Sequence, residues 1–512
     1  MQSRAAAIRH QTEIAGAGSA KRRWAALVVL MLPVLLVSVD GTALSFAVPL
    51  ISAALDPTGT QLLWIVDVYP LVLSVLLVPM GSLGDRIGRR KLLLIGATGF
   101  TIVSALAAFA PSAAYLIAGR ATMGFFGAML MPSTLSLIRN IFTVPGERRT
   151  AIAVWAAGFS GGAALGPIAG GFLLEHFYWG SVFLMAVPVL APFLLLAPIL
   201  VPESKDPNPG RVDPLSIGLI LLTMVPLVYS IKTFTHYGMS APLTLLLALA
   251  LVAGSLFVRR QLTEATPMLD VRLFKNPVFS GAVTVNLLSI FSQAGFLYFV
   301  SQHLQLVSGL SPMTAGMYLL PGLILTIASG LAVVPLVRHL RPGYTVALGL
   351  LCNAAAFALV AYAGPAGWDL GLVIAFGILG IGVGAAETIS NDLILGAVPA
   401  HKAGAASAIS ETAYETGSVL GTAVLGSILN AAYRSHIAIP DSLTAAQAAT
   451  ARETLGGATH LADGLDPSTA ASLMESAHSA FDSGVLITSI IGVVFMLIAA
   501  TIAWRSLRTA TA

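Results

Sequence analysis

The sequence contains very little charge. Only 10% of its 512 residues are Asp, Glu, Lys or Arg, whereas 56% are hydrophobic and the mean hydropathy is +0.87. A soluble domain carries about 25% charged residues, so this chain cannot cover a water-facing surface of ordinary size. The shortage of charge therefore excludes a soluble globular protein and indicates a chain surrounded mostly by lipid.

Cysteine, metal-binding clusters and catalytic motifs are also scarce. Cys352 is the single cysteine and lies in an apolar run, which excludes intramolecular disulfides and favours a small core residue over a reactive thiol. The sequence has no His/Cys cluster with metal-ligand spacing, no Gly-x-x-x-x-Gly-Lys-[Ser/Thr] loop and no nucleophile triad. Its basic residues are scattered through short loops, which argues against a nucleic-acid partner. We therefore expect neither an enzyme nor a metal or cofactor.

Long apolar runs are abundant instead. A helix needs about 20 mostly apolar residues to cross a bilayer, and this length predicts fourteen spans in groups of six, two and six. The spans are expected at 24–50, 62–82, 92–110, 115–138, 150–174, 180–200, 214–232, 241–259, 277–301, 312–335, 344–362, 370–395, 403–430 and 484–504.

The distribution of positive charge supports this count and predicts an orientation. If the N-terminus is cytoplasmic, all but four of the Lys and Arg residues fall on the cytoplasmic side. The exceptions are Lys232, Arg434 and Arg452, expected outside, and Arg120, embedded in the fourth span. Because cytoplasmic loops are enriched in Lys and Arg, we expect fourteen spans with both termini in the cytoplasm.

The grouping of the spans predicts four regions. They are a cytoplasmic tail at 1–23, a six-helix bundle at 24–200, two additional helices with their loops at 201–275 and a second six-helix bundle at 276–512. Two halves around a central cavity are typical of secondary transporters with internal repeats. The hydrophilic stretch 434–483 is expected outside as a helical hairpin with caps at Asp441-Ser442 and Asp466-Pro467, serving as a solvated linker or as a lid.

A charged loop rich in glycine follows the second span at 81–91, with the sequence Gly-Ser-Leu-Gly-Asp-Arg-Ile-Gly-Arg-Arg-Lys. Glycine permits a tight turn at the membrane face. We expect Asp85 just before a helix start, where the helix dipole and the neighbouring arginines favour its charge. The residues that define the motif are Gly81, Asp85, Arg86, Gly88 and Arg89.

The fifth span contains a second motif of small residues. It consists of Gly162, Gly166, Pro167, Gly170 and Gly171. Small residues four apart let helices approach closely, and proline removes a backbone hydrogen bond and bends the axis. The segment is therefore expected to pack tightly against a neighbouring helix.

Six acidic residues lie inside predicted spans: Asp40, Asp67, Glu387, Asp392, Glu411 and Glu415, of which Asp392 is expected at the cytoplasmic interface with a structural role. A carboxylate in hydrocarbon costs roughly 2.5–3.5 kcal/mol on insertion scales, so it is rarely present without a use. Glu411 and Glu415 are four apart and share a helix face. Two nearby carboxylates in low dielectric repel, so such a pair can exchange a proton for a cation. Asp67 lies near the outer end of its span and can alternatively reach the interface, and Glu387 can be structural.

Arg120 is an embedded cation that needs a counter-ion, and we expect Asp40 to supply it. Aromatic side chains can stack on a flat cation, although most aromatics in spans only pack or anchor at interfaces. The candidates for lining a cation site are Trp64, Tyr69, Trp155, Tyr298, Phe299 and Tyr414.

Together these motifs resemble the major facilitator superfamily. The segment 81–91 looks like its signature gating loop, and Arg120 matches its fourth-helix arginine. The segment 162–171 resembles the motif of its proton-coupled drug antiporters, which symporters usually lack. The resemblance runs from about residue 24 to the end of the chain.

One branch of the superfamily is matched in more detail. Val39-Asp40-Gly41-Thr42, followed by Ala47 and Pro49, is similar to the first-helix motif of the fourteen-helix drug:proton antiporters. The segments 64–69 and 410–417 resemble its quaternary ammonium efflux pumps in particular. The chain differs from these pumps at Ser410-Glu411, where they can have two adjacent acidic residues. The number of carboxyl groups that bind protons can therefore differ between them.

The resemblance implies an all-α integral membrane protein with two six-helix bundles and two extra central helices. It further implies a monomeric antiporter of the bacterial inner membrane, which exports lipophilic cations in exchange for protons and needs only the proton motive force. The alternative is a proton-coupled transporter, exporter or symporter, dedicated to one metabolite or lipid. A membrane enzyme or scaffold would leave the embedded acids unexplained.

Overall fold

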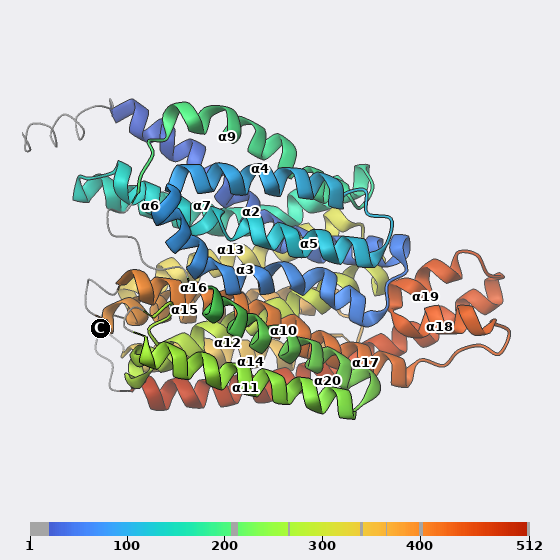
Figure 1. The fold of residues 1–512 in the computed structure, drawn as a ribbon. Helices are drawn as coiled ribbons and strands as arrows, with labels where there is room; N and C mark the ends of the chain where they lie inside the picture. The colour runs from blue at the N-terminus through green and yellow to red at the C-terminus, as the bar shows by residue number, and fades with distance from the viewer. Residues whose placement is uncertain are drawn as a thin grey trace, which may run out of the picture.

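The computed structural model describes residues 20–205, 213–264, 267–337, 341–364, 366–398 and 403–508. These ranges are built of helices and contain no strand, which confirms the expected all-α fold. The long helices run roughly parallel to one another, and the two halves of the chain form separate bundles (Figure 1). Most of the predicted tail, residues 1–19, lies outside the described ranges.

The first bundle comprises the first six predicted spans. The helices α5 and α6 together form one span, and so do α8 and α9. The elements are α2 (Ala20–Leu55), α3 (Gly59–Ile87), α4 (Arg89–Ala107), α5 (Ala113–Gly127), α6 (Leu130–Ile141), α7 (Pro145–His176), α8 (Ser181–Leu184) and α9 (Ala186–Leu200). A capping box between Thr58 and Gln61 starts α3, because it satisfies two backbone donors that would otherwise lack partners.

The second bundle is longer and contains two π-helical segments, η2 and η4. Its elements are α12 (Pro277–Gln302), η2 (His303–Val307), α13 (Pro312–Leu336), α14 (Pro342–Ala363), α15 (Asp369–Gly396), α16 (Ala403–Gly421), η4 (Thr422–Gly426), α17 (Ser427–His436), α18 (Ala445–Glu453), α19 (Leu455–Ala462) and α20 (Pro467–Leu507). Segments α16, η4 and α17 form one continuous helical run.

The two additional helices, α10 (Pro214–Tyr237) and α11 (Ala241–Thr263), form a hairpin and are followed by the short η1 (Val271–Lys275). Helix α10 packs against α3 of the first bundle and against η4 and α17 of the second. At the base of the hairpin Arg260 donates two hydrogen bonds to Asp213, at 2.8 and 3.2 Å. Burial alone would raise the pKa of the Asp213 carboxyl, but hydrogen bonds from Arg260 and Ser216 lower it to about 2.

We call the end that carries residues 81–91 the loop end, and the opposite end, which carries α18 and α19, the hairpin end (Figure 1). The hairpin differs from the predicted one. Thr444, not Asp441-Ser442, caps α18, and Thr454 caps a separate α19. Asp466 caps α20 as expected, but α20 then continues as one helix through the predicted last span. The second arm of the hairpin is therefore the end of a spanning helix.

Hydrogen bonds join the two bundles at the hairpin end. The Ser52 and Thr454 hydroxyls lie 2.9 Å apart, and the Gly59 N–H donates to Glu453 Oε2 at 3.0 Å. Asn430 Nδ2 donates to the Gly59 carbonyl at 3.3 Å. In the described ranges no hydrogen bond links the bundles at the loop end. The structure is therefore closed at the hairpin end.

Thirteen of the described helices are long and apolar enough to cross a membrane. The predicted span 403–430, which corresponds to α16, η4 and part of α17, is not one of the thirteen. The count of fourteen spans and the cytoplasmic position of the termini therefore stay predictions.

The small-residue motif of α7 packs between two helices. A Cβ on Gly162 would lie 3.0 Å from the Leu35 carbonyl oxygen, and one on Gly170 would lie 3.1 Å from Ala43 Cα, both on α2. A Cβ on Gly171 would lie 2.6 Å from Met313 Cα on α13. The motif therefore allows α7 to contact α2 within the first bundle and α13 of the second.

We predict that Gly171→Ala destabilises the protein by about 1–3 kcal/mol, the usual cost of overpacking. The new methyl group would meet the backbone of Met313, which cannot move away by changing rotamer. Thermal unfolding of the purified protein in detergent measures this effect. Gly161→Ala on the same helix is the control, because no atom lies within 4 Å of its added Cβ. Equal unfolding midpoints for the two variants would contradict the predicted contact.

Candidate functional site

The first embedded acid, Asp40 on α2, forms an ion pair with Arg120 on α5. Arg120 Nη1 lies 2.7 Å from Asp40 Oδ2, and the two side chains are 1% and 5% exposed. Arg120 Nε also donates to the Ile65 carbonyl at 3.2 Å, and its guanidinium carbon lies 4.5 Å from the centre of the Tyr69 ring. The buried cation is therefore matched by a carboxylate, a carbonyl and an aromatic face.

The second acid, Asp67 on α3, pairs with Lys232 on α10. The Nζ–Oδ2 distance is 2.9 Å, and the side chains are 0% (Lys232) and 1% (Asp67) exposed. The ammonium group also lies 4.1 Å from the centre of the Trp64 ring. The expectations that Lys232 lies outside and that Arg120 is the only cation in the bilayer were wrong. The predicted span ended at Lys232, whereas α10 continues to Tyr237 and keeps the lysine inside the packed helices.

Three further acids, Glu387 on α15 and Glu411 and Glu415 on α16, belong to the second bundle. Among the described residues, no basic side chain lies within ion-pair distance of any of the three. Glu411 lies close enough to both Glu387 and Glu415 for their charges to interact. The second bundle therefore carries a cluster of negative charge without a matching cation in the described part of the chain.

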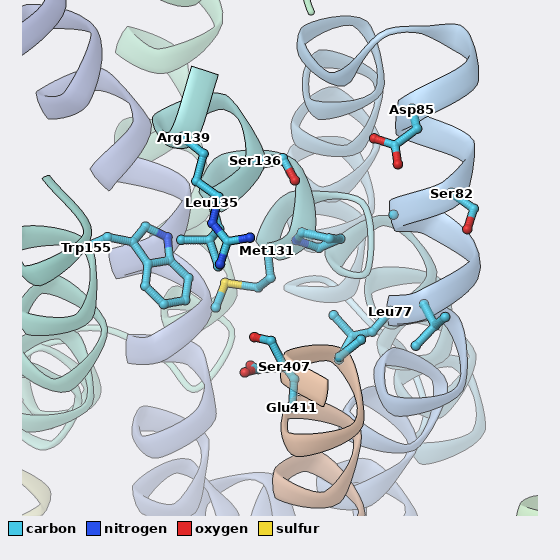
Figure 2. A pocket seen from close by; sticks show the side chains of 14 residues that line it. Leu77, Ser82, Asp85, Met131, Leu135, Ser136, Arg139, Trp155, Ser407 and Glu411 are labelled. Carbon is cyan, nitrogen blue, oxygen red and sulfur yellow. The ribbon is translucent and has the colours of Figure 1, made fainter. Parts of the chain in front are cut away.

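Glu411 lines a cavity of about 370 Å³ at the loop end. Trp155 of α7, Met131 and Arg139 of α6, and Asp85 of α3 form other walls. Figure 2 shows the Glu411 carboxylate pointing into this space from α16, with Trp155 and Arg139 on the other side. The cavity thus lies between the two bundles and is lined by two acidic side chains, one basic side chain and one aromatic side chain.

Glu415 lines a separate, deeper cavity of about 130 Å³. Its walls include Tyr69 and Arg120 of the first bundle and Gln293 and Tyr414 of the second. The sequence analysis treated Glu411 and Glu415 as a pair on one helix face. Their charges interact, but each carboxylate faces a different cavity, one helical turn apart along α16.

Aromatic residues connect the two cavities. The Trp155 and Phe159 rings stack with centroids 6.4 Å apart, and Phe159 meets Tyr414 edge-on at 6.0 Å. Phe159 lines the deeper cavity and Trp155 the other. Phe159 was not among the predicted aromatics, although it lies on α7 one turn from Trp155.

The other predicted aromatics lie elsewhere. Phe299 packs against Phe296 and Phe357 in the core of the second bundle, with ring centroids 5.2 and 6.4 Å away. Tyr298 is buried in the same core and lines neither described cavity. Trp64 covers Lys232, and Tyr69 covers Arg120. Of the six predicted aromatics, Tyr69, Trp155 and Tyr414 line a described cavity.

Ser410 occupies the position at which related pumps can have a second acidic residue beside Glu411. Its hydroxyl accepts from Asn286 Nδ2 at 2.9 Å and donates to the Asn391 side-chain oxygen. Ser410 is buried between α12 and α15 and lines neither cavity. This position holds α16 in place through a polar network and does not add a charge to the site.

The loop motif is arranged differently from the prediction. Helix α3 extends to Ile87, so Asp85 lies in its last turn and not before a helix start. The helix dipole is unfavourable for an acid there, and Arg89 compensates with an Nη2–Oδ1 distance of 2.7 Å. Arg86 is exposed. Asp85 also faces the loop-end cavity, which connects the motif to the site.

Glu203 is a partner of this motif that the sequence analysis missed. Its carboxylate accepts from the backbone N–H groups of Arg90 and Lys91, at 3.0 and 3.2 Å, and so caps the start of α4. Gly88 has φ +115°, and a Cβ there would lie 2.8 Å from this carboxylate. Gly88 is therefore required both by its backbone conformation and by the approach of Glu203.

Comparison with known proteins identifies the family. The Major Facilitator Superfamily sequence model matches residues 30–422. The chain belongs to the major facilitator superfamily. It is 54% identical over 481 residues to the multidrug efflux pump LfrA of Mycolicibacterium smegmatis, covering 94% of this chain and 95% of that protein. It is 38% identical to the methyl viologen resistance protein SmvA of Salmonella typhimurium, covering 90% and 93%.

Solved structures support the same fold. A bacterial homologue of the human lysosomal transporter Spinster, in an inward-facing and unoccupied conformation, superposes with a TM-score of 0.64 at 18% identity. It covers 96% of this chain and the whole of that chain, and it shows the fold alone. The chain is a transporter and a multi-pass protein of the bacterial inner membrane.

We predict that Asp40→Asn abolishes transport while the protein still reaches the membrane. The change leaves the buried Arg120 without its carboxylate, and removing one partner of a buried pair costs about 3–5 kcal/mol. Membrane abundance by immunoblot and efflux of a fluorescent cation measure the two parts. Proton-dependent efflux near the wild-type rate would show that the Asp40–Arg120 pair is dispensable.

Proposed function

We propose that the protein is a proton-coupled multidrug antiporter that exports lipophilic cations. The observation that carries this proposal is the cluster of Glu387, Glu411 and Glu415, which has no basic ion-pair partner in the described residues and of which Glu411 and Glu415 each line a cavity. Carboxylates in a low-dielectric site bind either a proton or a cation, because an isolated charge there is costly. Competition between the two cargoes at the same carboxylates couples their movement.

The arrangement supports a two-step path for the substrate. A cation from the loop end would first meet Glu411 and Trp155 in the larger cavity and then Glu415 and Tyr414 in the deeper one. Aromatic faces attract a desolvated cation, and the stacked Trp155 and Phe159 provide a continuous surface between the cavities. A flat, lipophilic cation suits this path better than a strongly hydrated one.

The Asp40–Arg120 pair would have a different role. Arg120 lines the deeper cavity beside Glu415, so its charge acts on any cation or proton that Glu415 binds. We propose that the pair sets the electrostatic potential of this cavity and that substrate does not displace it. A single chain contains all these groups, so a monomer suffices as the transport unit.

The names of two relatives support this function. One is named a multidrug efflux pump and another a methyl viologen resistance protein. Methyl viologen carries two positive charges, so the second name supports a substrate range that includes dications. The orientation predicted from the positive charges would place the loop-end cavity toward the cytoplasm, as export requires.

Transport of ethidium and methyl viologen into inverted membrane vesicles tests the proposal. We expect an acid interior to drive uptake of both cations, because protons then leave the vesicle as the cations enter. Glu415→Gln should abolish uptake of both. Glu411→Gln should reduce methyl viologen uptake at least about tenfold more than ethidium uptake, because a second charge needs a second carboxylate and tenfold corresponds to about 1.4 kcal/mol.

Two outcomes would contradict the proposal. Uptake that is independent of the pH gradient would exclude proton coupling. Transport of neither cation by a folded wild-type protein would favour an exporter dedicated to one metabolite. Glu264→Gln is a suitable control, because Glu264 pairs with Arg260 at 2.9 Å at the end of α11, away from both cavities.

A further inference from the structure

The ion pair between Asp67 and Lys232 has no part in the proposed substrate path. Neither residue lines a described cavity, and both side chains are at most 1% exposed. The pair joins α3 of the first bundle to α10, one of the two additional helices. The Asp67 carboxylate and the Trp64 ring together bind the Lys232 ammonium group. A carboxylate beside an aromatic ring would also bind a cationic substrate.

The pair lies where three parts of the molecule meet. Leu71 of α3, Val228 of α10, and Val419 and Ala423 of the α16–η4 run form one buried apolar cluster. The Thr422 hydroxyl of η4 interacts with Asp67, and the Tyr298 phenol of α12 lies within electrostatic range of it. Both groups belong to the second bundle. Helix α10 therefore bridges the two bundles at this point.

Opening of the hairpin end must disturb this junction. Alternating access moves one bundle against the other, and α10 packs against both. It cannot keep its contacts with α3 and with η4 and α17 while these separate. The π-helical η4 lies at the junction, and π-helical segments are frequent at functional sites.

We propose that Lys232 is a coupling residue whose ammonium group leaves Asp67 when the hairpin end opens, so that Asp67 then binds one proton from that side. This inference rests on the proposed proton-coupled transport and names a further residue for it. A buried carboxylate cannot stay charged without a partner, so separation of the pair requires uptake of a proton. Trp64 remains as a partner for the ammonium group.

The proton balance is simple. A proton from solution at the hairpin end forms an O–H bond with the Asp67 carboxylate when Lys232 withdraws. When the hairpin end closes, the returning ammonium group displaces this proton, and it leaves toward the loop end. Lys232 stays protonated throughout, and no other bond forms or breaks. One proton thus crosses with each opening and closing of the junction.

A double variant, Asp67→Asn with Lys232→Met, tests the proposal because it leaves no unmatched charge. We expect its ethidium dissociation constant to stay near that of the wild type, while accumulation driven by a pH gradient falls at least about tenfold, a usual size for an allosteric coupling. The number of protons moved per ethidium should also fall. The matched control is Asp213→Asn with Arg260→Gln, which neutralises the pair inside the α10–α11 hairpin and should leave both quantities unchanged.

A cross-link tests the same movement without changing either charge. In a Cys352→Ala background, Leu71→Cys and Val228→Cys joined by a short bifunctional thiol reagent would hold α10 against α3. We expect turnover to stop while ethidium binding persists, with recovery after reduction. The control is Thr223→Cys with Gly254→Cys, within the extra hairpin, where the Cβ–Cβ distance of 4.0 Å suits a disulfide.

The outcomes separate this inference from the proposed function. Wild-type coupling in the double variant, or full turnover of the Leu71–Val228 cross-linked protein, would reduce the pair to a structural contact and overturn the inference alone. If the double variant does not fold, the turnover of the cross-linked protein tests the inference instead. A wild-type protein that moves no protons with ethidium would overturn the proposed function and this inference with it.

Discussion

A charge inside the membrane has to be matched by another charge, and this constraint organises the structure. Asp40 and Asp67 are matched by cations of the chain itself, Arg120 and Lys232, in pairs that are almost fully buried. The glutamates of the second bundle have no such cation in the described residues, and Glu411 and Glu415 face cavities. The protein therefore leaves carboxyl groups without an ion-pair partner of its own at the places that a cation or a proton from solution could reach.

The seam between the bundles is built by two kinds of packing. On one side the glycines of α7 allow backbone contact with α2 and with α13. On the other side α10 packs against both α3 and the η4–α17 segment, and Lys232 pairs with Asp67 of α3. Helix α10 thus belongs to the interface between the bundles, whereas α11 packs mainly against α10. The two sides differ in chemistry, because glycine contacts can slide whereas a buried ion pair has to be broken.

Much of this could be predicted from the sequence, because hydrophobic length and embedded charge are local signals. The helical class and the tight packing of α7 follow from residue type and spacing. Lys232 was expected outside the membrane because the predicted span ended at this charged residue. Only the packed structure shows that Lys232 forms an ion pair with Asp67. Glu203 and the Ser410 network depend on contacts between distant segments, and no spacing rule reveals them. Asp85 was misplaced because α3 continues one turn further than its apolar run.

Proton release on substrate binding tests the central claim most directly. Ethidium would be added to the purified protein in weakly buffered solution with a pH indicator. The account predicts that the wild type releases protons as it binds, and that a Glu411→Gln, Glu415→Gln double variant releases none at ethidium concentrations that still give binding. Binding by the wild type without proton release, or undiminished release from the double variant, would contradict exchange at these glutamates.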